Sequence, residues 1–235
     1  RIRSRMVDPD LATLMIIQAP DFRLSGEGQD QSALSSLALL HDMTFERFIL
    51  RQDELPTDEK ANLMRVFELC HAYAQDPEGW LVLTVEYGCG KSHLAAAIAN
   101  KRMDLGYPAL FVVVPDLLDH LRATFSPTSL VRFDKRFEEV RTTPLLVLDD
   151  LGTESASPWA QEKLFQLINH RYNARLATII TTAQPIENVD PRLRTRMLDN
   201  RLCTIFAIMA PSYRGVSTKR QTTRRTTRRR SSSKS

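Results

Sequence analysis

The residues best suited to do chemistry lie in the short run GCGKS, from Gly88 to Ser92. Glycines at its first and third positions let successive backbone N–H groups curl around an anion, because no Cβ atoms stand in the way. Lys91 adds a cation on a long side chain, and Ser92 adds a hydroxyl that can bind Mg²⁺. An alanine-rich helix follows, and its N-terminus contributes partial positive charge. The run therefore predicts a site for a chain of phosphates.

The same residues form the second half of the pattern G-x-x-x-x-G-K-[ST], the Walker A loop, and the run resembles a nucleotide-binding P-loop. Lys91 would reach the β and γ phosphates of ATP. The pattern departs at its first glycine, which is Val85 here, with Glu86 beside it. A β-branched residue costs about 1–2 kcal/mol where the backbone needs a positive φ. A P-loop fold that has lost its ligand is the alternative. The expected ATP-binding residues of the loop are Tyr87, Gly88, Cys89, Gly90, Lys91, Ser92 and His93.

A second chemical run, LLVLDDLG, spans 145–152 and places two carboxylates at the end of an apolar strand. In a parallel sheet, such a strand delivers its last residues to the edge where the phosphate loop also opens. The run resembles a Walker B motif. Asp149 would hold Mg²⁺ together with Ser92, and Asp150 would orient or deprotonate the attacking water.

Taken together, GCGKSHLAAAIAN, the DPEGWLVL lead-in, LLVLDDLG, a TRM box and the SYR ending resemble the bacterial helicase-loader ATPases of the DnaC/DnaI type and the related IstB-like transposition ATPases. The resemblance covers about 45–214. It implies an AAA+ core with little or no helical lid.

The resemblance also assigns three roles outside the two Walker motifs. The run ATIITTA, 177–183, takes the place of the sensor strand, and Ala183 stands where the family usually has Asn. That leaves Thr181 or Thr182 to touch the attacking water, and Thr182 is our choice. Arg196 matches the arginine finger that stabilises the γ-phosphate of a neighbouring subunit, and Arg214 matches a late arginine near the nucleotide.

The hydrophobic pattern predicts strands that alternate with helices, which is typical of a mostly parallel sheet covered on both faces. The expected fold class is α/β, a P-loop NTPase three-layer sandwich with a five-stranded sheet. Strands are expected at 80–84, 109–114, 145–148, 177–182 and 204–209, and helices at 57–75, 116–124, 133–140 and 158–174. A turn rich in arginine is expected near 191–197.

Composition narrows the class of protein further. No run of 18 apolar residues and no signal peptide is present, so we expect a cytoplasmic protein without membrane contact. Three cysteines without a C-x-x-C pair support neither a disulfide framework nor a zinc site. Of the net charge of +4, eight basic residues without an acid lie in 215–235, so the remainder carries 4 − 8 = −4. This tail is expected to be disordered and could bind nucleic acid.

The chain also contains an internal repeat. Residues 1–23 match 192–214 at 11 of 23 positions. We interpret 1–23 as the remnant of an upstream copy of the same domain's C-terminal part, 24–43 as a linker, 44–214 as the AAA+ ATPase domain and 215–235 as a basic tail.

The motifs together predict an ATP-binding, Mg²⁺-dependent ATPase that controls the contacts of a replicative helicase with single-stranded DNA. The arginine finger would require a homo-oligomer. A transposition helper ATPase would share every motif. A degenerate nucleotide-binding module without hydrolysis is a third reading, favoured by Val85, Glu86 and Ala183.

Overall fold

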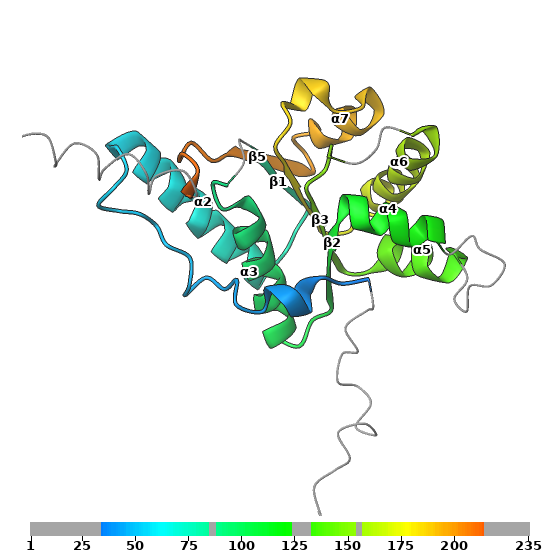
Figure 1. Cartoon of the computed structure of the whole chain (residues 1–235), viewed down its shortest axis with the longest axis horizontal. Helices are drawn as coiled ribbons and strands as arrows, with labels where there is room; N and C mark the ends of the chain where they lie inside the picture. Colours follow the sequence, from blue (N-terminus) through cyan, green and yellow to red (C-terminus); the bar gives the residue numbers. More distant parts are fainter. Residues whose placement is uncertain (1–33, 85–87, 124–132, 154–156, 214–235) are drawn as a thin grey trace, which may run out of the picture. The chain divides into compact units, whose positions relative to one another are not determined.

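The computed structural model describes residues 34–84, 88–123, 133–153 and 157–213 of the 235-residue chain. Within these ranges, five strands alternate with helices along the sequence (Figure 1). The elements are η1 (Leu37–Leu40), α2 (Thr57–Gln75), β1 (Trp80–Thr84), α3 (Lys91–Asp104), β2 (Ala109–Val113), α4 (Val114–Ala123), α5 (Phe133–Thr142), β3 (Leu145–Asp149), α6 (Pro158–Asn173), β4 (Thr178–Thr182), η2 (Ile186–Asn188), α7 (Pro191–Met197) and β5 (Cys203–Ala207).

The strands form one sheet in the order β2-β3-β4-β1-β5, and every pair of neighbours is parallel. The strand that enters the phosphate loop, β1, therefore lies beside β4, and β4 lies beside β3, which carries the two carboxylates. In the register, Leu148 of β3 lies opposite Ile180 of β4. The strands run in one direction, so their carboxyl ends meet at one edge, where the candidate site lies.

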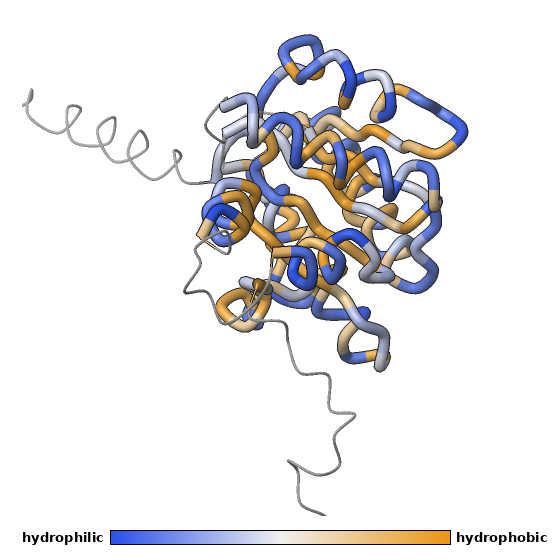
Figure 2. The backbone as a smooth tube through the Cα atoms, turned by 90° about the vertical axis from the view of Figure 1, so that its right-hand side faces the viewer, coloured by the Kyte–Doolittle hydropathy of each residue, from blue (hydrophilic) through white to orange (hydrophobic). Residues whose placement is uncertain are grey.

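Helices cover both faces of the sheet, which gives three layers (Figure 1). Helices α2 and α3 pack on one face, and α4, α5, α6 and α7 pack on the other. Hydrophobic residues concentrate in the strands between the layers, whereas the outer helices carry most of the hydrophilic ones (Figure 2). Burial on both faces explains why the strands are almost continuously apolar instead of alternating.

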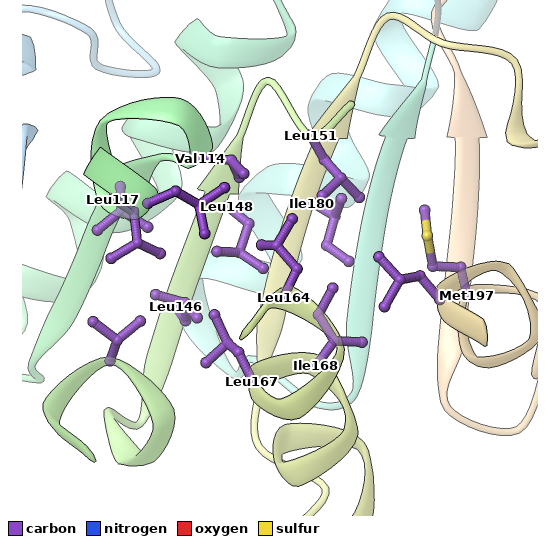
Figure 3. Close-up of a cluster of buried hydrophobic side chains, with 14 of the residues drawn as sticks. Val114, Leu117, Leu146, Leu148, Leu151, Leu164, Leu167, Ile168, Ile180 and Met197 are labelled. Carbon is purple, nitrogen blue, oxygen red and sulfur yellow. The ribbon is translucent and has the colours of Figure 1, made fainter. Parts of the chain in front are cut away.

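The core on the α6 face illustrates how the strands and helices interlock. Leu146 and Leu148 of β3 point toward Leu164 and Leu167 of α6 (Figure 3). On the opposite face, the alanines of α3 are fully buried, and their small size lets α3 lie close against the sheet. This close packing holds the N-terminus of α3 at the sheet edge.

The expected fold class is confirmed, and the expected strands appear within one or two residues of their predicted bounds. The Ser157 side chain caps α6 by accepting a hydrogen bond from Ala160 N–H at 3.3 Å. Residues 191–197 form helix α7 instead of the predicted turn. Asp190 caps this helix and Pro191 occupies its first turn, which is a standard helix start. None of the described helices combines the length and the apolar character needed to span a membrane.

Part of the range predicted as a linker packs against the domain. Of 24–43, residues 34–43 are described, and Leu37 of η1 is only 1% exposed. Ser36 N–H donates to Phe111 O, and the Asn100 side chain donates to the carbonyls of Leu40 and Met43. The serine-rich composition suggested a linker, but Leu37 is buried against the domain, and Leu39 alone of the four leucines in 34–43 is exposed. The predicted remnant and the basic tail lie outside the described residues.

A fully buried arginine on α6, Arg171, forms hydrogen bonds at the amino-terminal ends of β3 and β4. Arg171 Nε donates to Thr178 Oγ1 of β4 at 2.9 Å. Its other nitrogens donate to Thr143 O at 2.8 Å and Ala177 O at 2.6 Å, directly before β3 and β4. Burial lowers the pKa of Arg171 to about 10, so the guanidinium keeps its charge at neutral pH. It therefore satisfies several buried carbonyls at once.

Candidate functional site

The phosphate loop owes its shape to two glycines in the left-handed region. Gly88 has φ +82° and Gly90 has φ +100°, conformations that other residues adopt only with strain. A Cβ atom on Gly90 would lie 2.9 Å from the Phe48 ring, so the position is also crowded. Helix α3 begins at Lys91, directly after this turn. The N–H groups of its first turn therefore point out of the helix at the loop, as an anion site requires.

Lys91 lies inside the site rather than on the surface, with 5% of its area exposed. Its Nζ lies 3.8 Å from the sulfur of Cys89, which is also buried. A lysine this deeply buried is held close to whatever occupies the loop, and its charge is weakly screened there. Both residues line the cavity above the loop.

Asp149 ends β3 and is also 5% exposed. Burial raises the pKa of Asp149 above its usual value, and hydrogen bonds from the Thr181 and Ser92 hydroxyls oppose that rise. The Thr181 bond to Asp149 Oδ1 is 2.6 Å long. The structure thus brings together Ser92 and Asp149, the two residues predicted to bind a metal.

These two oxygen donors suit a hard cation. Mg²⁺ is usually held by one or two protein oxygens, waters and the substrate's phosphates, rather than by a cage of side chains. The described part of the chain contains no group of three His, Cys, Asp or Glu side chains placed to hold a metal. Ser92 and Asp149 fit such a sparse Mg²⁺ site.

Asp150 follows the last residue of β3, and the backbone turns there at the carboxyl edge of the sheet. Its φ of +57° is unusual for a residue other than glycine. The strained turn is held because Asp150 N–H donates to Thr181 Oγ1 at 3.0 Å. The side chain lines the cavity above the phosphate loop. A strained backbone conformation next to a cleft is a common feature of active sites.

The structure separates the two threonines that the sequence offered for the sensor strand. Successive strand residues face opposite sides of a sheet, and Thr181 faces α3 and the loop, whereas Thr182 faces α6. The Thr182 hydroxyl donates to Leu151 O at 2.8 Å and accepts from Gln184 N–H at 3.1 Å. Thr182 therefore lies away from Asp149 and Asp150, whereas the Thr181 hydroxyl bonds to both residues.

A cavity of about 550 Å³ opens above the loop. Besides the loop and Asp150, two segments that sequence reasoning did not include line it: residues from 43–51 before α2, and Ala210, Ser212 and Tyr213 after β5. Phe48, Arg51 and Tyr213 are the main additions. They carry no local motif, and the strand order brings them to the loop from distant parts of the sequence. The SYR ending was the one signal that pointed toward this region.

His93 joins the loop to the first of these segments. Its Nε2 lies 2.9 Å from Thr44 O, and its ring makes an edge contact with Phe48 at 5.3 Å between centroids. The residue lines the cavity, but these contacts make it a packing residue as well as a candidate for ATP binding.

Arg196 lies apart from the cavity of its own chain. It is half-buried on α7, where its Nε donates to Asn169 Oδ1 at 3.2 Å and its guanidinium lies 4.8 Å from the Phe165 ring centre. The structure does not bring it together with Lys91 and Asp149. Tyr87 and Arg214 fall outside the described residues, as do Val85 and Glu86.

Comparisons with known proteins add to this geometry. The model of a family described as IstB-like ATP binding protein matches residues 29–222. The replicative helicase loader DnaI of Bacillus subtilis (strain 168) is 26% identical over 162 residues, which cover 68% of this chain and 51% of DnaI. The chain thus spans about half the length of that relative.

A second relative matches over more of its length. The replicative helicase loader DnaC of Escherichia coli (strain K12) is 23% identical over 199 residues, 76% of this chain and 81% of DnaC. A crystal structure of the DnaC helicase loader superposes with a TM-score of 0.59 at 21% identity, over 72% of this chain and 98% of that one. The structural likeness shows a shared fold.

The raised pKa of Asp149 predicts that its charge destabilises the nucleotide-free protein. The folded-state pKa lies above the unfolded-state value, so the charged form is disfavoured by folding at neutral pH. We expect Asp149→Asn to raise the free energy of unfolding by about 1 kcal/mol at pH 7, measured by urea denaturation. The gain should shrink as the pH falls through the folded-state pKa toward the usual carboxyl value, because the wild-type residue then becomes neutral too.

Asp53→Asn is the matched control, since Asp53 is an exposed carboxylate in a loop. It should leave the free energy of unfolding within about 0.5 kcal/mol of the wild type. A destabilised Asp149→Asn protein at pH 7 would contradict the prediction.

Proposed function

Because this chain belongs to the family of IstB-like ATP binding proteins, we propose that its cavity binds ATP with Mg²⁺ and that the bound ATP is hydrolysed. The observation that carries the proposal is the meeting of Lys91, Ser92 and Asp149 beneath one cavity. An anion-binding helix start, a buried cation and an oxygen site for a metal are the parts that a nucleoside triphosphate requires.

The lining of the cavity suggests how the nucleotide would lie. The loop and Lys91 occupy one end and favour the phosphates. Phe48, Ile49 and Tyr213 line the remainder, and aromatic or apolar side chains of this kind suit a nucleobase. When bound, Mg²⁺ would neutralise charge on the phosphates. Ser92 and Asp149 would hold the ion, and no other described side chain is required for that role.

Hydrolysis would use Asp150 and Thr181 in different ways. Asp150 faces the cavity and would orient or deprotonate the attacking water. Thr181 would not contact the substrate; its hydroxyl fixes the Asp149 carboxylate and the Asp150 backbone at once. We therefore place Thr181 as a positioning residue and withdraw Thr182 from the catalytic set.

We further propose that Arg196 acts on ATP bound to a neighbouring copy of the chain. Within one chain it is held by Asn169 and by the Phe165 ring, away from the cavity. Such an arginine can complete a site in trans, because its charge stabilises the γ-phosphate in the transition state. A homo-oligomer is therefore part of the proposal.

The relatives suggest a cellular role. DnaI and DnaC are replicative helicase loaders, and we propose that this chain likewise uses its nucleotide state to control a replicative helicase and single-stranded DNA in the cytoplasm. The family also admits a transposition helper with the same site, which would act on a transposase. Ala183 at the usual sensor position favours a third candidate, a module that binds ATP without hydrolysing it.

The first test is nucleotide binding. We expect a fluorescent ATP analogue to bind with a micromolar Kd in the presence of Mg²⁺, and Lys91→Ala to weaken binding by at least about tenfold, since the buried cation contacts the phosphates. Lys101→Ala, on the distal half of the same helix, is the control. Equal binding by the wild type and Lys91→Ala would refute the site, and binding without turnover would select the non-hydrolysing module.

Paired threonine variants separate the two faces of β4. Thr181→Val removes the hydroxyl that holds Asp149, so we expect Mg²⁺-dependent ATP binding and kcat each to fall about tenfold, the usual cost of losing a supporting partner of a metal ligand. Thr182→Val removes bonds to Leu151 and Gln184 on the other face. It should lower the thermal midpoint and leave the Mg²⁺ dependence intact. Titration of Mg²⁺ in both variants decides the assignment, and a larger Mg²⁺ effect in Thr182→Val would reverse it.

Complementation tests the action of Arg196 in trans. Arg196→Ala should reduce DNA-stimulated ATP hydrolysis by about 10³-fold, and Asp150→Asn should do the same from within the site. Mixing the two inactive proteins should restore activity, because one supplies the arginine and the other supplies the intact site. Arg194→Ala, on the same helix with its bond to Glu187 O, is the control. A mixture that stays inactive would count against a shared site.

A further inference from the structure

Arg51 is a buried arginine at the rim of the nucleotide cavity, 40 residues before Lys91 in the sequence. Its side chain is 6% exposed. Nη1 donates to Pro211 O at 2.7 Å, and Nε donates to Glu54 Oε2 at 3.3 Å. The guanidinium carbon lies 5.8 Å from the centre of the Tyr213 ring. Arg51 has φ +51°, so its own backbone is in a strained conformation.

The segment that Arg51 holds lies directly on the phosphate loop. Tyr213 N–H donates to Gly88 O at 2.9 Å. A Cβ atom on Gly88 would come within 2.3 Å of Ser212 Oγ. Residues 211–213 are therefore in close contact with the first glycine of GCGKS, and a continuous set of contacts runs from Arg51 through Pro211 and Tyr213 to Gly88.

The loop has a reason to need such support. A preformed anion site depends on backbone N–H groups that are held in place before the ligand arrives. Glycine makes the loop shape possible, but it also gives the unbound loop more freedom to lose. The Walker pattern's first glycine is Val85 here, so the loop departs from the usual sequence just before Gly88. A contact that holds Gly88 from outside limits the conformations open to the loop.

We propose that Arg51 is a positioning residue for the phosphate loop: it holds 211–213 against Gly88, and so fixes the loop N–H groups that receive the phosphates. The inference rests on the proposed nucleotide site and adds to it a residue outside the Walker motifs. Arg51 acts through Pro211 and Gly88, not by contact with the nucleotide.

A purely stabilising role explains Arg51 less well. Its carboxylate partner, Glu54, is half exposed, and such ion pairs contribute little to stability. Burying a guanidinium costs free energy that an apolar side chain of similar size would avoid. What a guanidinium provides here, and a methionine would not, is a directed donor to Pro211 O.

Arg47 offers a matched control. It lines the same cavity, but it is exposed and its bond is to the exposed Asp42. Removing it takes one cation from the cavity rim without disturbing Pro211 or Gly88. The comparison therefore separates the loss of positive charge from the loss of loop support.

The test compares Arg51→Met, Arg51→Lys and Arg47→Met in two measurements. The first is the Kd for ATP and for inorganic tripolyphosphate with Mg²⁺. Arg51→Met should weaken both by about tenfold, because the loop receives the phosphates in both ligands. Arg51→Lys keeps the positive charge and one donor group, so its affinity for both ligands should fall by only about threefold. Arg47→Met removes a rim charge but no loop contact, so it should weaken binding of both ligands less than Arg51→Met does, and an equal loss would assign the effect to charge and overturn the inference.

The second measurement needs no ligand. Hydrogen exchange by NMR, measured without nucleotide, reports how often the Tyr213 N–H that donates to Gly88 O opens to solvent. Arg51→Met should speed its exchange at least tenfold while amides of β3 stay protected, and Arg47→Met should not. A lower thermal midpoint with unchanged Kd values and unchanged Tyr213 exchange would show a stabilising role and overturn the inference.

Failure of the proposed function would look different. If the wild type bound neither ATP nor tripolyphosphate, the nucleotide site would be refuted, and the positioning of a phosphate loop by Arg51 would fall with it. Faster Tyr213 exchange in Arg51→Met would then establish a structural contact alone. Binding by the wild type that Arg51→Met and Arg51→Lys both retain would overturn the inference and leave the nucleotide site standing.

Discussion

The burial of the Asp149 carboxylate is the constraint on which the rest of the site depends. A charge this deep in the sheet edge is tolerated because hydroxyl groups donate to it, and one of them comes from Thr181 on the neighbouring strand. That pairing exists only in one register. A shift of β4 by one residue would turn Thr181 to the other face of the sheet, and in one of the two directions it would bring Ile180 to the carboxylate. The register of β3 against β4 is therefore a requirement of the site, not of the fold alone.

Two sets of hydrogen bonds, one at each end of the strands, keep that register. Arg171 donates to the carbonyls that precede β3 and β4 at the opposite edge of the sheet. These bonds fix the first residues of the two strands relative to each other. At the site edge, Leu151 N–H donates to Thr181 O, and the Gln184 side chain donates to Gly152 O. The strained turn at Asp150 lies between the Thr181 bond to Asp149 and the Thr181 bond to Leu151. Strain of this kind persists where the surroundings over-determine it, and here bonds on both sides of the turn do so.

The parts of the site that could be predicted from the sequence are those with a local cause. A few neighbouring residues are enough to recognise each of them: the glycines that need a positive φ, the lysine in the next helical turn, and the carboxylate at the end of an apolar strand. The choice between Thr181 and Thr182 could not be made, because the face of a strand residue depends on its register. Arg51 and Phe48 could not be found either, since strand order alone carries them to the loop. The helix at 191–197 was missed although Asp190 and Pro191 signal its start, because its arginines suggested an exposed turn.

Closure of the cavity by two segments that are distant in sequence couples the loop to both ends of the described chain. Residues 43–51 precede α2 and residues 210–213 follow β5, yet both contact the glycines of the loop. A force or a partner that moved either segment would change the packing around Gly88 or Gly90, and thereby the N–H groups that receive the phosphates. The converse holds by linkage: a ligand that orders the loop stabilises the position of both segments. Occupancy of the proposed nucleotide site would therefore also stabilise residues outside the Walker motifs, through contacts that are already in place.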